Sequence, residues 1–241
     1  MLKGCIAWPP KFAAMYREKG YWEDITLNQM LEKSVKEYGA EDAIVDGEKR
    51  YSYLEVQNNI EILAAHFADI GLKTDQRVVF QLPNSAELIF ALFALFKVGA
   101  IPVMSLSPHR ENEIRHFVKH AEAVGYFFPD EYRGFDYRDM ADEIKAESPS
   151  LEYLFVLGDA GQDHISLGAL LETPPPQDMD LTGRSMAADD VALMLLSGGT
   201  TALPKLIPRT HNDYVLNCTA SAPLNGLGDR KSYLAVLPMA H

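Results

Sequence analysis

The chain has 241 residues, of which 47% are hydrophobic and 23% charged, a balance typical of a globular protein with a sizeable core. Its formal net charge of −12 argues against nucleic acid or an anionic membrane as the main partner, because both need a basic surface. Cys5 and Cys218 give no disulfide framework and no metal-ligand spacing. No signal-peptide-length apolar stretch precedes Pro9 and no run is long enough for a bilayer, so we expect a cytoplasmic protein.

The first elements alternate between helix and strand. Apolar residues at helical spacing predict an amphipathic helix over 26–38 that Gly39 ends. The turn signal Asp46-Gly47 predicts a hairpin over 42–53. A second helix is expected over 54–70, with Gly71 at its end. These elements are followed by the most apolar part of the chain.

The stretch 77–106 predicts a strand, a buried helix and a second strand. Residues 77–82 are rich in β-formers, Ser85 is an N-cap candidate for a helix over 86–98, and 101–106 is again strand-like. Such a βαβ unit implies a parallel sheet covered on both faces. A helix over 111–123 and strands over 124–130 and 151–158 extend the same α/β pattern.

The last third begins with a proline-rich polar stretch, 171–190, that predicts a surface linker. Residues 191–196 predict a buried strand, and 232–241 a final strand. His116 and His120 lie one helical turn apart, and with no His-Glu signature nearby a solvated helix face is favoured over a metal pair.

A loop of small residues follows the strand at 191–196. Ser197 to Thr201 read Ser-Gly-Gly-Thr-Thr, and Lys205 comes shortly after. Glycines let backbone N–H groups face an anion, hydroxyls add donors, and a lysine adds a mobile charge. A Walker A loop is excluded, because Pro204 precedes the lysine and Leu206 follows it. By composition alone, a polar turn between two strands is an equal alternative.

The spelling of this region carries a resemblance. "LSGGTTALPKLIPRTHNDY" is similar to the phosphate-binding signature of the adenylate-forming superfamily, and closest to its stand-alone aryl-acid ligases of siderophore pathways. "WPPKFAAMYREKGYW", "QLPN", "SPHRENEI" and the final "LPMAH" resemble the same group. Ala202 departs from the usual glycine of the signature, and alanine would stiffen the loop if that position needs a positive φ.

The resemblance implies an acyl-CoA synthetase-like α/β fold, a parallel-rich sheet covered by helices with the phosphate loop on a strand–turn–strand. Residues 1–185 would form a first subdomain of the adenylation core, and 186–241 the phosphate-loop segment and the start of the next subdomain. By the same resemblance, we expect the C-terminal domain of the family to lie outside this chain. We therefore expect residues 1–241 alone to be inactive.

The implied reaction is ATP-dependent activation of an aryl acid, 2,3-dihydroxybenzoate, to its acyl-adenylate. The acyl group then passes to the phosphopantetheine arm of an aryl carrier protein. ATP and Mg²⁺ are the implied cofactors, no protein metal site is expected, and an oligomer is left open. The alternatives are a salicylate or other acyl-CoA or acyl-AMP ligase, and a non-catalytic N-terminal fragment that only binds nucleotide or a partner.

The resemblance also implies roles for particular residues. The loop that holds the β- and γ-phosphates would comprise Ser197, Gly198, Gly199, Thr200, Thr201 and Lys205, with Lys205 as the catalytic residue. His241 would lie at the mouth of the aryl-acid pocket, the alternative being a strand-end histidine packed on the core. Arg209 and His211 are interpreted as structural.

Overall fold

The computed structural model describes residues 2, 4–176, 186–197, 204–227 and 232–240. Its helices are α1 Pro10–Glu18, α2 Leu27–Tyr38, α3 Tyr53–Ile70, α4 Ala86–Val98, α5 Glu111–Ala121, α6 Arg138–Glu147, α7 Leu167–Glu172 and α8 His211–Leu224. Its strands are β1 Asp42–Asp46, β2 Lys49–Ser52, β3 Arg77–Phe80, β4 Ile101–Met104, β5 Gly125–Pro129, β6 Glu131–Tyr132, β7 Phe135–Asp136, β8 Tyr153–Leu157, β9 Ile165–Ser166, β10 Val191–Leu196 and β11 Leu206–Thr210.

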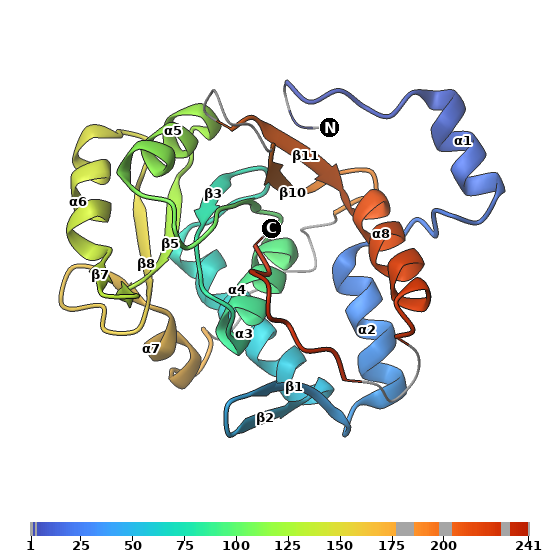
Figure 1. Cartoon of the computed structure of the whole chain (residues 1–241), viewed down its shortest axis with the longest axis horizontal. Coiled ribbons are helices and arrows are strands. Elements are labelled where there is room, and N and C mark those ends of the chain that lie inside the picture. Colours follow the sequence, from blue (N-terminus) through green and yellow to red (C-terminus); the bar gives the residue numbers. More distant parts are fainter. Residues whose placement is uncertain (1, 3, 177–185, 198–203, 228–231, 241) are drawn as a thin grey trace.

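A seven-stranded sheet in the order β11-β10-β4-β3-β5-β8-β9 forms the centre of the molecule (Figure 1). All neighbouring strands in it are parallel except β10 and β11, which form an antiparallel pair at one edge. The predicted βαβ unit is confirmed, because β3 and β4 pair in parallel on either side of α4. The sheet therefore has the α/β architecture that the sequence predicts.

Helices cover both faces of the sheet, and the sheet divides the core into two apolar layers. Alternate residues of β3 point to opposite faces: Val78 and Phe80 pack with α3 and α4, whereas Val79 packs with α5 and α6. In Figure 1, α5 and α6 lie on one side of the sheet and α2 and α8 are neighbours on the other side of the molecule. The central strands β3, β4 and β5 are buried on both faces, which explains their nearly continuous apolar sequences.

Local signals place most of the early elements where the sequence predicts them. Ser85 caps α4, because its hydroxyl accepts a hydrogen bond from the N–H of Leu88 at 3.1 Å. Gly71 ends α3 with a φ of 115°, a left-handed conformation that favours glycine. The hairpin is also confirmed, since β1 and β2 pair in antiparallel across Gly47, whose φ is 59°.

The prediction of a final strand over 232–241 is wrong. Residues 232–240 form no strand in the structure, and Tyr233, Leu234, Val236 and Leu237 are exposed. The physical reason is that the backbone of this segment hydrogen-bonds to the side chain of Asn84 rather than to a neighbouring strand. Of the expected linker, 177–185 lie outside the described residues, and its first two residues belong to α7.

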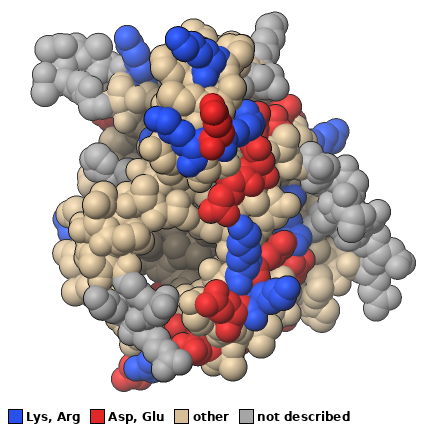
Figure 2. All heavy atoms as spheres, turned by 90° about the vertical axis from the view of Figure 1, so that its right-hand side faces the viewer, with Lys and Arg blue, Asp and Glu red and all other residues tan. Residues whose placement is uncertain are grey.

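None of the helices in the described ranges is both long and apolar enough to cross a membrane. Figure 2 shows the face of the molecule that looks to the right in Figure 1, with a hollow beside a band of charged side chains. Lysine and arginine are interspersed there with aspartate and glutamate, so this face offers no extended basic patch.

Candidate phosphate-binding site

The strands β10 and β11 bring the two ends of the glycine-rich loop together. Leu196 pairs with Leu206, and the next pair is Ser197 and Lys205. The N–H of Ser197 donates to the carbonyl of Lys205 at 2.9 Å, and the N–H of Lys205 donates to the Ser197 hydroxyl oxygen at 2.9 Å. Two of the predicted site residues are thus in direct contact at the base of the loop.

The chemistry of this pair suits an anion. The Ser197 oxygen accepts from Lys205, so its own O–H proton stays available for another acceptor. Lys205 is exposed, and among the described residues no carboxylate forms an ion pair with its ammonium group. Gly198, Gly199, Thr200, Thr201 and His241 lie outside the described residues, as does Ala202.

Helix α5 contacts the same loop from the other side. The carbonyl of Pro204, the residue before Lys205, lies 3.2 Å from Nε2 of His116. A carbonyl only accepts, so this nitrogen carries the proton and donates. The ring of His116 is half-buried and stacks on that of His120 at 5.4 Å between centroids. The solvated-face interpretation therefore fits His120, which is exposed, but not His116.

The residues that follow β11 tie the loop strand to the N-terminal part of the chain. His211 is 1% exposed, and its Nδ1 accepts a hydrogen bond from the N–H of Leu27 at 3.2 Å, at the first turn of α2. Burial lowers the pKa of His211 to about 4, so the ring is neutral near pH 7. Arg209, on β11, forms an ion pair with Asp213 in the first turn of α8. These contacts agree with a structural role for Arg209 and His211.

A second polar network fixes the loop after β4. Gln81 is fully buried, and its Nε2 donates to the carbonyls of Leu106 and His109 at 2.8 and 2.9 Å. Its Oε1 accepts from the hydroxyl of Tyr126. The two motifs "QLPN" and "SPHR" thus meet in space, because the glutamine of the first holds the backbone of the second.

With this geometry in place, comparison with known proteins identifies the family. Residues 31–241 match the AMP-binding enzyme family over most of the chain. The chain belongs to this family. It is 40% identical over its whole length to the 2,3-dihydroxybenzoate-AMP ligase of Bacillus subtilis, and 39% identical to the salicyl-AMP ligase / salicyl-S-ArCP synthetase of Mycobacterium tuberculosis.

The family's solved structures agree with the fold. The apo structure of MbtA from Mycobacterium smegmatis superimposes with a TM-score of 0.89 at 37% identity and covers 99% of this chain. The chain covers 44% of that structure and 43% of each of the two ligases above. It therefore spans less than half the length of the relatives it matches.

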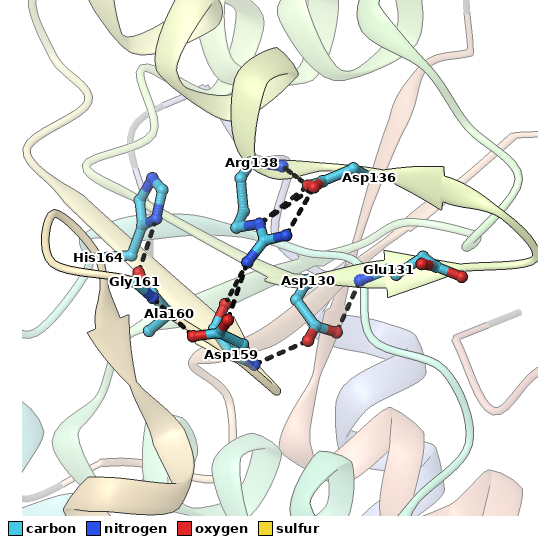
Figure 3. Close-up of polar contacts among 8 residues, drawn as sticks. All are labelled: Asp130, Glu131, Asp136, Arg138, Asp159, Ala160, Gly161 and His164. Carbon is cyan, nitrogen blue, oxygen red and sulfur yellow. Dashed lines mark hydrogen bonds and ion pairs between the residues drawn. The ribbon is translucent and has the colours of Figure 1, made fainter.

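Three carboxylates of this AMP-binding protein are held by hydrogen bonds and ion pairs within the fold. Figure 3 shows Asp130, Asp136 and Asp159 around Arg138. Asp130 accepts from the N–H groups of Glu131 and Asp159, and Asp136 pairs with Arg138 at 2.7 Å. A side chain on Gly158, whose φ is 115°, would overlap the Asp130 carboxyl group. These carboxylates bind backbone and arginine, and we assign them no ligand.

A cavity of about 460 Å³ lies beside α5, α6 and β7. Arg110 on its wall already donates to the carbonyls of Ser107 and His109 and to the Tyr137 hydroxyl. Its guanidinium is therefore engaged. The lining residues are Arg110, Glu111, Phe135, Asp136, Asp139, Met140 and Glu143. Within the described ranges, no group of three or more His, Cys, Asp and Glu side chains could hold a metal ion.

Two residues make tertiary contacts that the sequence does not predict: His116 contacts the loop, and Asn84 contacts the segment before His241. In the sequence His116 stands out only as half of a histidine pair, and Asn84 only as the last residue of the motif "QLPN" at the end of the strand-like run. The partners of both lie far along the chain, at Pro204 and at residues 235–239. No local sequence pattern predicts contacts between residues so far apart in the chain.

Proposed function

We propose that this chain is the N-terminal part of a cytoplasmic aryl-acid ligase that activates 2,3-dihydroxybenzoate with ATP for siderophore biosynthesis. In the first step a carboxylate oxygen of the acid attacks the α-phosphorus of ATP. The bond to the β-phosphate oxygen breaks, and pyrophosphate leaves. In the second step the phosphopantetheine thiol of an aryl carrier protein attacks the acyl carbon, and AMP leaves.

In this proposal the loop 197–205 holds the β- and γ-phosphates. Backbone N–H groups of Gly198 and Gly199 and the hydroxyls of Ser197, Thr200 and Thr201 donate to phosphate oxygens, and the Lys205 ammonium offsets the charge that develops on pyrophosphate. The fixed contact between Ser197 and Lys205 supports this role, because donors that are already in place need no reorganisation during the reaction.

The remaining assignments follow from the same proposal. His241 contacts the aryl acid. Mg²⁺ would accompany ATP and supply neutralisation of phosphate charge, as is usual for this ion with nucleotides. The division into a subdomain over 1–185 and a second segment over 186–241 is also proposed, although β10 pairs with β4 and the sheet crosses that boundary.

The observation that carries the proposal is the match over the entire chain to the ligase named for 2,3-dihydroxybenzoate. The similar match to the salicyl-AMP ligase makes salicylate the second candidate substrate. Both acids have a hydroxyl group beside the carboxylate, so they test the same pocket. An acyl-CoA ligase and a fragment that only binds nucleotide or a partner are the remaining alternatives.

The test is ATP–pyrophosphate exchange by a complete ligase containing these residues, with 2,3-dihydroxybenzoate, salicylate, benzoate and a long-chain fatty acid as substrates. We expect 2,3-dihydroxybenzoate to give the highest kcat/KM. A preference for salicylate would replace the substrate but keep the reaction. Absence of exchange with every aryl acid would contradict the proposed function.

A further inference from the structure

The side chain of Asn84 forms three hydrogen bonds to the backbone of residues 235–239. Its Nδ2 donates to the carbonyls of Ala235 and Leu237 at 3.0 and 2.9 Å. Its Oδ1 accepts from the N–H of Met239 at 2.8 Å. One amide group therefore fixes three alternate residues of a segment about 150 positions later in the chain.

The backbone on either side of Asn84 is itself held in place by neighbouring elements. The next residue, Ser85, caps α4, and the N–H of Ala86 donates to the Asp46 carboxylate at the end of β1 at 3.0 Å. Leu82, two residues before Asn84, is 1% exposed in the core. The hairpin, the core and the helix thus fix the backbone on both sides of Asn84.

Residues 232–240 have few other polar contacts in the described part of the chain. Its one further backbone bond there joins the N–H of Val236 to the carbonyl of Leu234. Leu234, Val236 and Leu237 are 82%, 75% and 76% exposed, so their side chains do not anchor it. Only its end is packed, since Ala240 is 5% exposed and lies in the core with Met239 against it.

We propose that Asn84 is a positioning residue for acid binding: it sets the path of residues 235–239, which lead directly to His241. The inference rests on the proposed function, because it takes His241 as the acid-contacting residue. Asparagine suits the position because it offers two donors to two carbonyls and one acceptor to one N–H. Aspartate would put an acceptor opposite carbonyl oxygens and lose both donor bonds.

The test compares Asn84→Ala and Asn84→Asp with a matched control, Asn59→Ala. Asn59 also donates to a backbone carbonyl, but to Glu55 within its own helix α3. The first readout is amide hydrogen exchange of a peptide covering 232–240. The second is the KM for 2,3-dihydroxybenzoate and for ATP in pyrophosphate exchange by a complete ligase, with thermal melting to confirm that each variant folds.

Both Asn84 variants should speed exchange in 232–240 by about tenfold or more, because local opening sets amide protection. They should also raise the KM for the acid about tenfold while changing the KM for ATP less than about twofold, because misplacing a binding segment by about 1 Å is costly. Asn59→Ala should change neither readout.

Unchanged amide exchange in both Asn84 variants would overturn the inference. So would faster exchange with an unchanged KM for the acid, which would leave a structural contact without a role in binding. If the unsubstituted ligase activates no aryl acid, the proposed function fails, and with it the acid-positioning role. Faster amide exchange in 232–240 of the variants would then show only that Asn84 holds this segment in place.

Discussion

His211 and Lys205, on either side of β11, differ in burial. His211 is enclosed between α2 and α4, where its ring contacts Phe96 edge-on and its Nδ1 accepts from Leu27. Lys205, six residues earlier, is exposed at the base of the loop. The histidine is therefore held neutral as a structural acceptor, while the lysine side chain is accessible to a phosphate.

The state of His211 makes stability depend on pH. Its folded pKa of about 4 lies below the ordinary value of 6.5, so the unfolded chain binds the proton more readily. The stabilisation is complete above pH 6.5 and is lost as pH falls toward 4. We expect the free energy of unfolding to fall by about 2 kcal/mol between pH 7.5 and pH 5 because of this group alone.

Urea unfolding of the wild type and of His211→Gln at both pH values measures this effect. Other titrating groups contribute equally to both proteins and cancel in the comparison. The glutamine variant should be less stable at pH 7.5 but should lose about 2 kcal/mol less on acidification. Parallel pH profiles for the two proteins would show that His211 is not held neutral by the fold.

Removing the Lys205 charge should act on pyrophosphate rather than on the acid. In a complete ligase, Lys205→Ala should raise the activation free energy of ATP–pyrophosphate exchange by about 2–4 kcal/mol and so slow the exchange. Binding of the aryl acid should be nearly unchanged. Lys36→Ala, on an exposed part of α2, is the control. An exchange rate equal to that of the control would remove Lys205 from the catalytic role.

At the scale of elements, the parts with strong local signals were predictable. Helix α4 begins and ends where the sequence indicates, because Ser85 caps it and Gly99 terminates it with a φ of 82°. The parallel order of β3 and β4 follows from the buried helix between them. In these elements, propensity, capping and burial all favour the same structure.

The segment 232–240 shows where local reasoning stops. Its apolar and β-forming residues predict a strand, but a strand needs a partner, and here the side chain of Asn84 takes two carbonyls and one N–H. The contact between His116 and Pro204 is likewise tertiary. Both contacts join residues that sequence spacing does not bring together.

Helix α5 should restrain the loop through His116. His116→Ala removes the donor to the Pro204 carbonyl, so the chain around Lys205 should open more often. Trypsin cleaves after lysine, and cleavage between Lys205 and Leu206 reports this opening. We expect cleavage to be about threefold faster or more in His116→Ala, as measured by mass spectrometry.

His120→Ala is the matched control for this experiment, because His120 stacks on His116 but makes no hydrogen bond to the loop in the described structure. His116→Gln keeps a side-chain donor and should restore slow cleavage in part. Equal cleavage rates in the His116→Ala and His120→Ala variants would show that α5 does not hold the loop.

At the scale of the whole molecule, the chain combines a well-packed α/β core with one side of a candidate site. Residues 31–241 match the AMP-binding family, and the fold superimposes on the MbtA structure with a TM-score of 0.89. The two ligases it matches are more than twice as long as this chain. Loss of groups that act together is far from additive.

The most direct test of the central claim is one exchange assay on two proteins. ATP–pyrophosphate exchange with 2,3-dihydroxybenzoate is measured for a complete ligase containing these residues and for residues 1–241 alone, both at the same concentration. The account predicts acid-dependent exchange by the complete ligase and a rate near background for residues 1–241. Robust exchange by residues 1–241, or none by the complete ligase, would contradict it.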